Sequence, residues 1–217
     1  MGAKTWMLVY AAGNARATLA NSPQLDRDAT FRLATELFPK DRLEPIDDGS
    51  LLYTSPPDDE MSIGSFPGLS VVAAKEFGID YPSTLPSRFL TRARDRTVYL
   101  HAMHSVVDWF AYAIWRNGVL ERSLSLSPDH GVIEDIGPRL TFEQPYWSGQ
   151  HPAFEPGDED EGDPPYPFPF HPLELGEAAL REFFGYQLEG SPTLSDIDPE
   201  SIPLAQYKRK SSKFKFW

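Results

Sequence analysis

The stretch FAYAIWRNGVLERSLSLS, residues 110–127, decides the fold because two β patterns flank the dipeptide Asn117-Gly118. Both central positions of a two-residue type I′ turn need a positive φ angle, which Asn and Gly adopt most readily. The hairpin also lies within the strongest β region of the chain, Thr97 to Leu126. We therefore predict an antiparallel hairpin at the centre of a sheet.

A turn at Asn117-Gly118 also determines which side chains face each other. Trp115 then faces Leu120, and Ala113 faces Arg122, on a mostly apolar side. Tyr112 meets Ser123 on the other side. Rings beside hydroxyls are typical of a shallow binding surface, although the pattern also fits an ordinary solvent-facing side. The predicted binding surface consists of Phe110, Tyr112, Ser123, Ser125 and Ser127, with Tyr146 and Trp147 as further exposed aromatic residues.

Strand and helix patterns occur in mixed order along the rest of the chain. Lys4–Ala11 is typical of a buried central strand, and residues 173–185 (LELGEAALREFFG) form an amphipathic pattern that Gly185 ends. Residues 67–78 fit a short helix or a strand, and we favour the helix. This order predicts an α+β fold in one domain, residues 1–217, with a central antiparallel or mixed sheet and helices packed mainly on one face.

Two segments have an unusual composition. Residues 145–172 are rich in proline, glycine and acid, which predicts a loop excursion with no helix or strand ladder. Its end, PPYPFPFHP, can dock on the body through Tyr166, Phe168 and Phe170. Residues 208–217 (KRKSSKFKFW) are a basic aromatic tail. Such a tail can bind nucleic acid or a membrane surface, but we favour a tail that is solvated or folds back on the acidic loop.

The composition excludes several classes of function. The 217 residues contain no cysteine, so disulfides, thiol nucleophiles and cysteine-based metal sites are excluded. The net charge of −12 opposes nucleic acid as a partner. Because of this charge, we expect no nucleic-acid partner. No apolar run is long enough for a membrane span, so we expect no membrane partner and a cytoplasmic location. No dinucleotide fingerprint follows a strand, so we expect no cofactor.

The segment LHAMHSVVDW, residues 100–109, contains the candidate catalytic residues His101, His104 and Asp108. A straight strand from Thr97 to Trp115 would be too long, so we expect a break near His104. A tight reversal there would place His101 opposite Asp108, next to Ser127. A nucleophilic serine needs histidine between itself and the carboxylate, so this order fails, and no G-x-S-x-G elbow occurs. We expect a structural His101–Asp108 contact rather than catalysis.

The same histidines offer a weak metal site. In a regular strand His101 and His104 point to opposite faces, which makes a poor chelate. A turn between them could bring both together, with Asp108 or Glu134 as a third ligand. Because a histidine bonded to a carbonyl or carboxylate is the commoner arrangement, we predict no metal and keep His101, His104 and Glu134 as the alternative.

Several motifs resemble one protein family: MGAKTWMLVYA, YLHAMHSVVDWFAYAIW, RSLSLSPDHGVIEDIG, PYWSGQHP and FHPLELGEAALREFFG. Together they resemble an uncharacterised family of bacterial cytosolic proteins, catalogued as a domain of unknown function. The resemblance extends from Met1 to about Tyr207. It implies a bacterial single-domain protein with no established activity, and it supplies no catalytic residues. The basic tail after Tyr207 stands outside it.

Two functions of different classes fit the sequence. The first is a non-enzymatic module that binds or regulates another protein, of the immunity type, because the chain is acidic and has exposed aromatic residues near Tyr146. The alternative is a hydrolytic or metal-dependent enzyme that uses the His101, His104 and Asp108 region. In an enzyme these side chains converge in a concave pocket, whereas in a binding module backbone hydrogen bonds occupy them. The sequence does not fix the oligomeric state.

Overall fold

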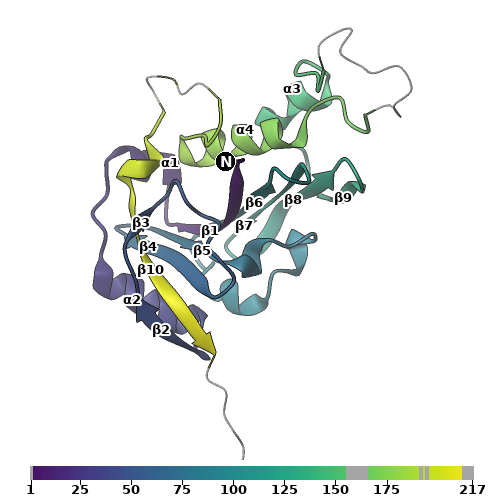
Figure 1. Cartoon of the computed structure of the whole chain (residues 1–217). Helices are drawn as coiled ribbons and strands as arrows, with labels where there is room; N and C mark the ends of the chain where they lie inside the picture. Colours follow the sequence, from purple (N-terminus) through teal and green to yellow (C-terminus); the bar gives the residue numbers. More distant parts are fainter. Residues whose placement is uncertain (1, 155–165, 191–192, 194–195, 212–217) are drawn as a thin grey trace, which may run out of the picture.

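The chain forms an antiparallel β-sheet of ten strands, and its helices pack against this sheet (Figure 1). The structure, a computed structural model, describes residues 2–154, 166–190, 193 and 196–211. The strands lie in the order β2-β10-β4-β5-β1-β6-β7-β8-β9, and β3 pairs with β10. The strands are β1 (Lys4–Ala11), β2 (Asp41–Pro45), β3 (Gly49–Ser50), β4 (Glu60–Phe66), β5 (Leu69–Ala73), β6 (Thr97–His104), β7 (Trp109–Arg116), β8 (Val119–Ser127), β9 (Gly131–Ile136) and β10 (Pro203–Ser211).

The helices are short apart from two. The α-helices are α1 (Ala15–Ala20), α2 (Arg27–Leu37), α3 (Gln144–Trp147) and α4 (Pro172–Phe184). The 3-10 turns are η1 (Lys75–Phe77), η2 (Pro82–Thr84), η3 (Ser87–Phe89), η4 (Thr141–Glu143) and η5 (Pro199–Ser201). The prediction of an α+β fold with a central antiparallel sheet is confirmed.

The sheet buries apolar side chains on both faces, because alternate residues of a strand point to opposite sides. Met7 and Val9 of β1 pack in one core with α1 and α4, on what we call the α4 face. Leu8 and Tyr10 pack in a second core with α2, on what we call the α2 face. Helices therefore cover both faces (Figure 1), and the expectation that they pack mainly on one face is not confirmed.

Helix α4 ends at Gly185 as its sequence predicts, and it begins one residue earlier than the predicted pattern, at Pro172. The Nδ1 atom of His171 accepts a hydrogen bond from the backbone N–H of Leu173, and Gly185 ends the helix at a φ of 80°. Gly176 lets α4 approach the sheet closely, because a Cβ atom there would lie 2.7 Å from the Met103 sulfur. This close approach brings the backbone of α4 within hydrogen-bonding distance of β6.

The predicted hairpin forms, but its register is wrong beyond the first pairs. Asn117 and Gly118 have φ angles of 51° and 82°, and Trp115 pairs with Leu120 as expected. A β-bulge then shifts the pairing, so Tyr112 lies opposite Leu124 instead of Ser123. The extra residue of a bulge exchanges the two faces of the strand that follows. The serine row of β8 therefore lies on the α2 face, and Arg122 points to the α4 face.

Two segment predictions change as well. Residues 69–73 form strand β5 rather than a helix, with every side chain buried. The excursion 145–172 is not free of helix, because α3 and the first residue of α4 fall within it; Phe168 and Phe170 are buried in the core of the α4 face. Residues 155–165 of this excursion lie outside the described residues.

The first part of the basic tail belongs to the sheet. Lys208, Arg209 and Lys210 are in β10. Their partners are acidic residues: Lys208 Nζ lies 3.3 Å from Asp59, and the Arg209 guanidinium donates to Glu76 over 2.6 and 2.9 Å. Residues 212–217 of the predicted tail lie outside the described residues.

Candidate functional site

A pocket opens on the α2 face, at the end of the sheet where β1 begins and β6 ends. We name it the Trp6–Trp109 pocket after its two indole walls. Its volume is about 550 Å³, which is within the usual range for ligand sites. The other ring and hydroxyl side chains that line it are Tyr81, His104, Ser127 and His130.

Strand register assembles the aromatic wall. His104 lies directly opposite Trp109, and the strand β1 beside them contributes Trp6. The Trp6 ring centroid lies 5.7 Å from that of His104 and 5.8 Å from that of Trp109. Trp109 Nε1 donates to the Ser125 hydroxyl over 3.2 Å, which fixes the indole orientation. The bulge that moves the serine row onto this face thus supports the pocket.

The pocket is acidic at its exposed parts. Asp80 and Asp129 line it and are exposed, and among the described residues neither carboxylate has a hydrogen bond or an ion pair. One cation is already near the aromatic wall, because Lys4 Nζ lies 4.9 Å from the Trp6 ring centroid. Burial lowers the pKa of His104, and the Lys4 ammonium lowers it further.

Strand β9 borders the pocket and forms one edge of the sheet (Figure 1). Its outer backbone groups pair with no strand among the described residues. Val132 and Ile136 are exposed on it, to 45% and 40%. Its acidic Glu134 points to the α2 face, where it accepts hydrogen bonds from the Ser83 backbone N–H at 3.0 Å and from the Ser123 hydroxyl. These two hydrogen bonds hold β9 in place from the α2 face.

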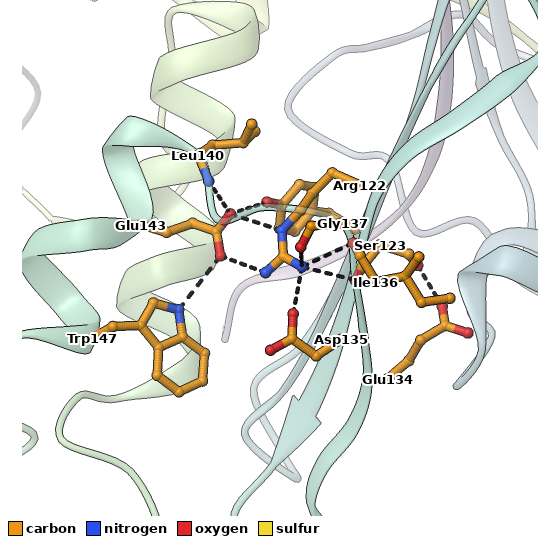
Figure 2. Close-up of polar contacts among 10 residues, drawn as sticks. Arg122, Ser123, Glu134, Asp135, Ile136, Gly137, Leu140, Glu143 and Trp147 are labelled. Carbon is orange, nitrogen blue, oxygen red and sulfur yellow. Dashed lines mark hydrogen bonds and ion pairs between the residues drawn. The ribbon is translucent and has the colours of Figure 1, made fainter.

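A buried ion pair holds the other face of β9 (Figure 2). Arg122 donates from Nε and Nη2 to the Glu143 carboxylate over 2.9 and 2.7 Å, and both side chains are almost fully buried. Nη1 of Arg122 donates to Asp135 and, over 3.0 Å, to the Ile136 carbonyl oxygen. Because Arg122 is on β8, these bonds attach the end of β9 to its neighbour from the α4 face.

Glu143 has further donors around it (Figure 2). The Tyr112 hydroxyl donates to it over 2.6 Å, the Leu140 backbone N–H over 2.7 Å, and the Trp147 indole over 3.4 Å. Burial and the adjacent carboxylate raise the pKa of Tyr112 well above its usual value. So many hydrogen bonds to one buried carboxylate are typical of a structural ion pair.

Sequence reasoning missed this pair. The available signal was Arg122, a charged residue at an inward position of an alternating strand, which requires a buried carboxylate partner. In the predicted register Arg122 lies opposite Ala113, whose side chain has neither a negative charge nor a hydrogen-bond acceptor for the guanidinium.

The three candidate catalytic residues do not converge. His101 is fully buried on the α4 face, where Nε2 donates to the Gly176 carbonyl oxygen over 3.0 Å and Nδ1 accepts from the Thr5 hydroxyl over 2.8 Å. Burial lowers the pKa of His101 to about 4. Both ring nitrogens are therefore occupied, which leaves no lone pair for proton transfer or metal binding. His104 faces the opposite side, in the pocket.

The predicted His101–Asp108 contact is wrong. The reversal comes later than expected, between His104 and Trp109, so His101 lies opposite Tyr112. Asp108 lies in the turn with a φ of 45°, and its carboxylate is 3.6 Å from Nε2 of His171. The predicted break in the strand at His104 is confirmed.

The candidate metal ligands and the serine are also separate. Glu134 is bound by Ser83 and Ser123, and no group of three His, Asp or Glu side chains in the described part of the chain can hold a metal ion. Ser127 is buried, and its hydroxyl lies 3.2 Å from Nδ1 of His130 within one turn. No carboxylate orients that imidazole among the described residues.

The comparisons with known proteins identify the family. The model of a family of unknown function, DUF6928, matches residues 5–207. The chain belongs to this family. No curated protein and no solved structure matches the chain. The DUF6928 match ends within β10, before the part of the tail that lies outside the described residues.

In this DUF6928 member the residues of the predicted binding surface do not lie together on one face of the sheet. Phe110 and Tyr112 are buried on the α4 face, and Ser123 and Ser125 are buried on the α2 face. Ser127, the last of the serine row, lines the Trp6–Trp109 pocket. Tyr146 and Trp147 are half-buried in α3, where their rings lie 5.8 and 4.9 Å from Phe170. None of the described helices is long and apolar enough to cross a membrane.

Proposed function

We propose that this protein is a non-enzymatic, regulatory or immunity-type module that binds another protein by adding an extended segment of that partner to the edge of β9. Its bacterial origin and cytoplasmic location are part of the same proposal and rest on the sequence alone. Addition of a strand to a free sheet edge is a common mode of peptide recognition, in which backbone hydrogen bonds give affinity and side-chain pockets give specificity.

The observation that carries the proposal is the difference between the two edges of the sheet. The β2 edge, DRLEP, has the charged residues Arg42 and Glu44 and ends at Pro45, features that protect an edge against pairing. The β9 edge exposes Val132 and Ile136, and its acidic side chains are held against the faces of the sheet. A strand that is held from both faces and exposes two apolar side chains is suited to pair with another chain. The irregularity in its ladder with β8, between Ser125 and Leu126, is the one edge-protecting feature that we find along it.

A hydrolase built on His101, His104 and Asp108 has less support. Thr5 and Gly176 occupy the imidazole of His101, and Asp108 faces His171 instead. Of these three residues, His104 lines the pocket, whereas His101 and Asp108 do not.

Backbone NMR with a defined peptide tests the proposal. The probe is acetyl-Thr-Val-Thr-Gln-Thr-Val-Thr-amide, a neutral β-forming sequence, titrated into the full chain. We expect shifts of the amide resonances of residues 131–136 and slower exchange of the outward-pointing N–H groups. Val132→Lys places a charge on the edge and abolishes the shifts, whereas Val119→Lys, at an exposed site on β8, leaves them unchanged. Shifts that avoid β9 in the wild-type protein contradict the proposal.

A further inference from the structure

The Trp6–Trp109 pocket has the chemistry of a cation site, and it lies beside the edge where a partner strand would pair. This inference rests on the proposed function and specifies the side chain that the partner supplies. We propose that a lysine or arginine of the partner segment enters the Trp6–Trp109 pocket, between its indole walls and the carboxylates of Asp80 and Asp129.

The aromatic wall provides the first part of the argument. Two indoles and an imidazole pack against one another in the wall of the pocket, and the Trp6 ring centroid lies 5.7 Å from that of His104 and 5.8 Å from that of Trp109. The face of an indole attracts cations more strongly than that of any other side chain. The chain already uses this attraction, because the ammonium of Lys4 lies 4.9 Å from the Trp6 ring.

The carboxylates provide the second part. Asp80 follows η1 and Asp129 lies in the turn from β8 to β9, so two separate segments bring acid to the same pocket. Other acidic residues near the sheet, such as Asp59 and Glu76, have a cationic partner. Asp80 and Asp129 have none among the described residues, and a chain with net charge −12 attracts a cationic segment from a distance.

The position of the pocket provides the third part. Val132 and Ile133 of β9 line it, so the edge and the pocket share residues. Side chains of an added strand point alternately to the two faces, about 6.8 Å apart on one face. A partner strand on β9 therefore carries one of its side chains over the pocket, and a lysine or arginine stem is long enough to enter it.

The test compares two peptides that differ in one residue. Acetyl-Thr-Val-Thr-Lys-Thr-Val-Thr-amide is titrated beside the neutral peptide that has glutamine at the central position, at low salt. We expect the lysine peptide to bind about 3- to 10-fold more tightly and to shift the indole N–H resonances of Trp6 and Trp109. A trimethyllysine version keeps the charge without N–H donors, so its affinity shows how much of the gain comes from the rings.

Matched variants make the test specific. Asp80→Asn combined with Asp129→Asn removes the preference for lysine and leaves binding of the glutamine peptide unchanged. Asp47→Asn combined with Asp95→Asn changes the net charge equally at exposed sites away from the pocket and keeps the preference. Equal binding of both peptides at β9 overturns the cation site but leaves the proposed function intact. Failure of both peptides to affect β9 overturns the proposed function itself.

Discussion

His101 on β6 and Gly176 on α4 are joined by a hydrogen bond of 3.0 Å from the ring Nε2 to the carbonyl oxygen. The bond exists because residue 176 has no side chain. A Cβ atom there would lie 2.7 Å from the Met103 sulfur and 3.1 Å from the Phe110 ring. The neutral imidazole and the glycine thus act together to fix the main helix on the sheet.

Gly176→Ala should therefore destabilise the fold by about 1–3 kcal/mol, because the added methyl group pushes α4 away from Met103 and Phe110. Urea unfolding measures the change. Gly13→Ala is the matched control, because its Cβ would meet nothing within 4 Å. A stability for Gly176→Ala equal to that of Gly13→Ala would show that the helix does not need this contact.

His101 and Glu177 should make the stability of the fold depend on pH in opposite directions. The folded pKa of His101, about 4, is below its usual value, so its contribution is present above pH 6.5 and is lost as pH falls through about 4. Burial raises the pKa of Glu177 to about 7, so its contribution is present below pH 4.5 and is lost as pH rises through about 7.

Unfolding of two variants at pH 4.5 and pH 8 separates these contributions. His101→Asn should cost more stability at pH 8 than at pH 4.5, since the wild-type protein has already lost part of the histidine contribution in acid. Glu177→Gln should be relatively more stable at pH 8, where the wild-type carboxylate is charged and buried. The same pH slope in a variant and in the wild-type protein would contradict the assignment for that residue.

Removal of one partner of the Arg122–Glu143 pair should cost about 3–5 kcal/mol, because it leaves the other charge buried without a counter-charge. Arg122→Met and Glu143→Leu are the single variants, and the double variant should cost less than their sum. Arg116→Met breaks an exposed pair with Glu121 and should cost less than about 1 kcal/mol. Additive costs in the double variant would show that the two side chains are not energetically coupled.

Lys4→Gln should raise the pKa of His104, because it removes a positive charge that disfavours the imidazolium. NMR titration of the His104 ring protons measures this shift. The variant also frees one face of Trp6, so the lysine peptide should bind about 2-fold more tightly or better. An unchanged His104 titration would place Lys4 too far away to act on the ring.

Local patterns predicted the parts of the fold that depend on local chemistry. The Asn117-Gly118 turn, the strand at Lys4–Ala11 and the stop of α4 at Gly185 follow from turn and cap preferences. The bulge beyond Trp115 does not, because Arg122 gains a buried partner from a segment 21 residues away. A single-residue register shift then changed the face of every serine on β8.

The candidate site was harder to predict for the same reason. Its walls come from β1, from the segment after η1, and from β6 to β9, and neither Trp6 nor Asp80 has a neighbour in sequence that indicates a pocket. The histidines that did stand out, His101 and His104, lie on opposite faces, as strand geometry requires for positions three residues apart.

The difference between the two sheet edges has a consequence for stoichiometry. A sheet with two unprotected edges can act as a link in an open-ended series, because each added copy offers a new edge for the next. Here Arg42, Glu44 and Pro45 protect one edge, so the proposed pairing at β9 does not continue through β2. If a partner strand pairs with β9 as proposed, we expect one partner strand for each molecule rather than a series of copies joined through both edges.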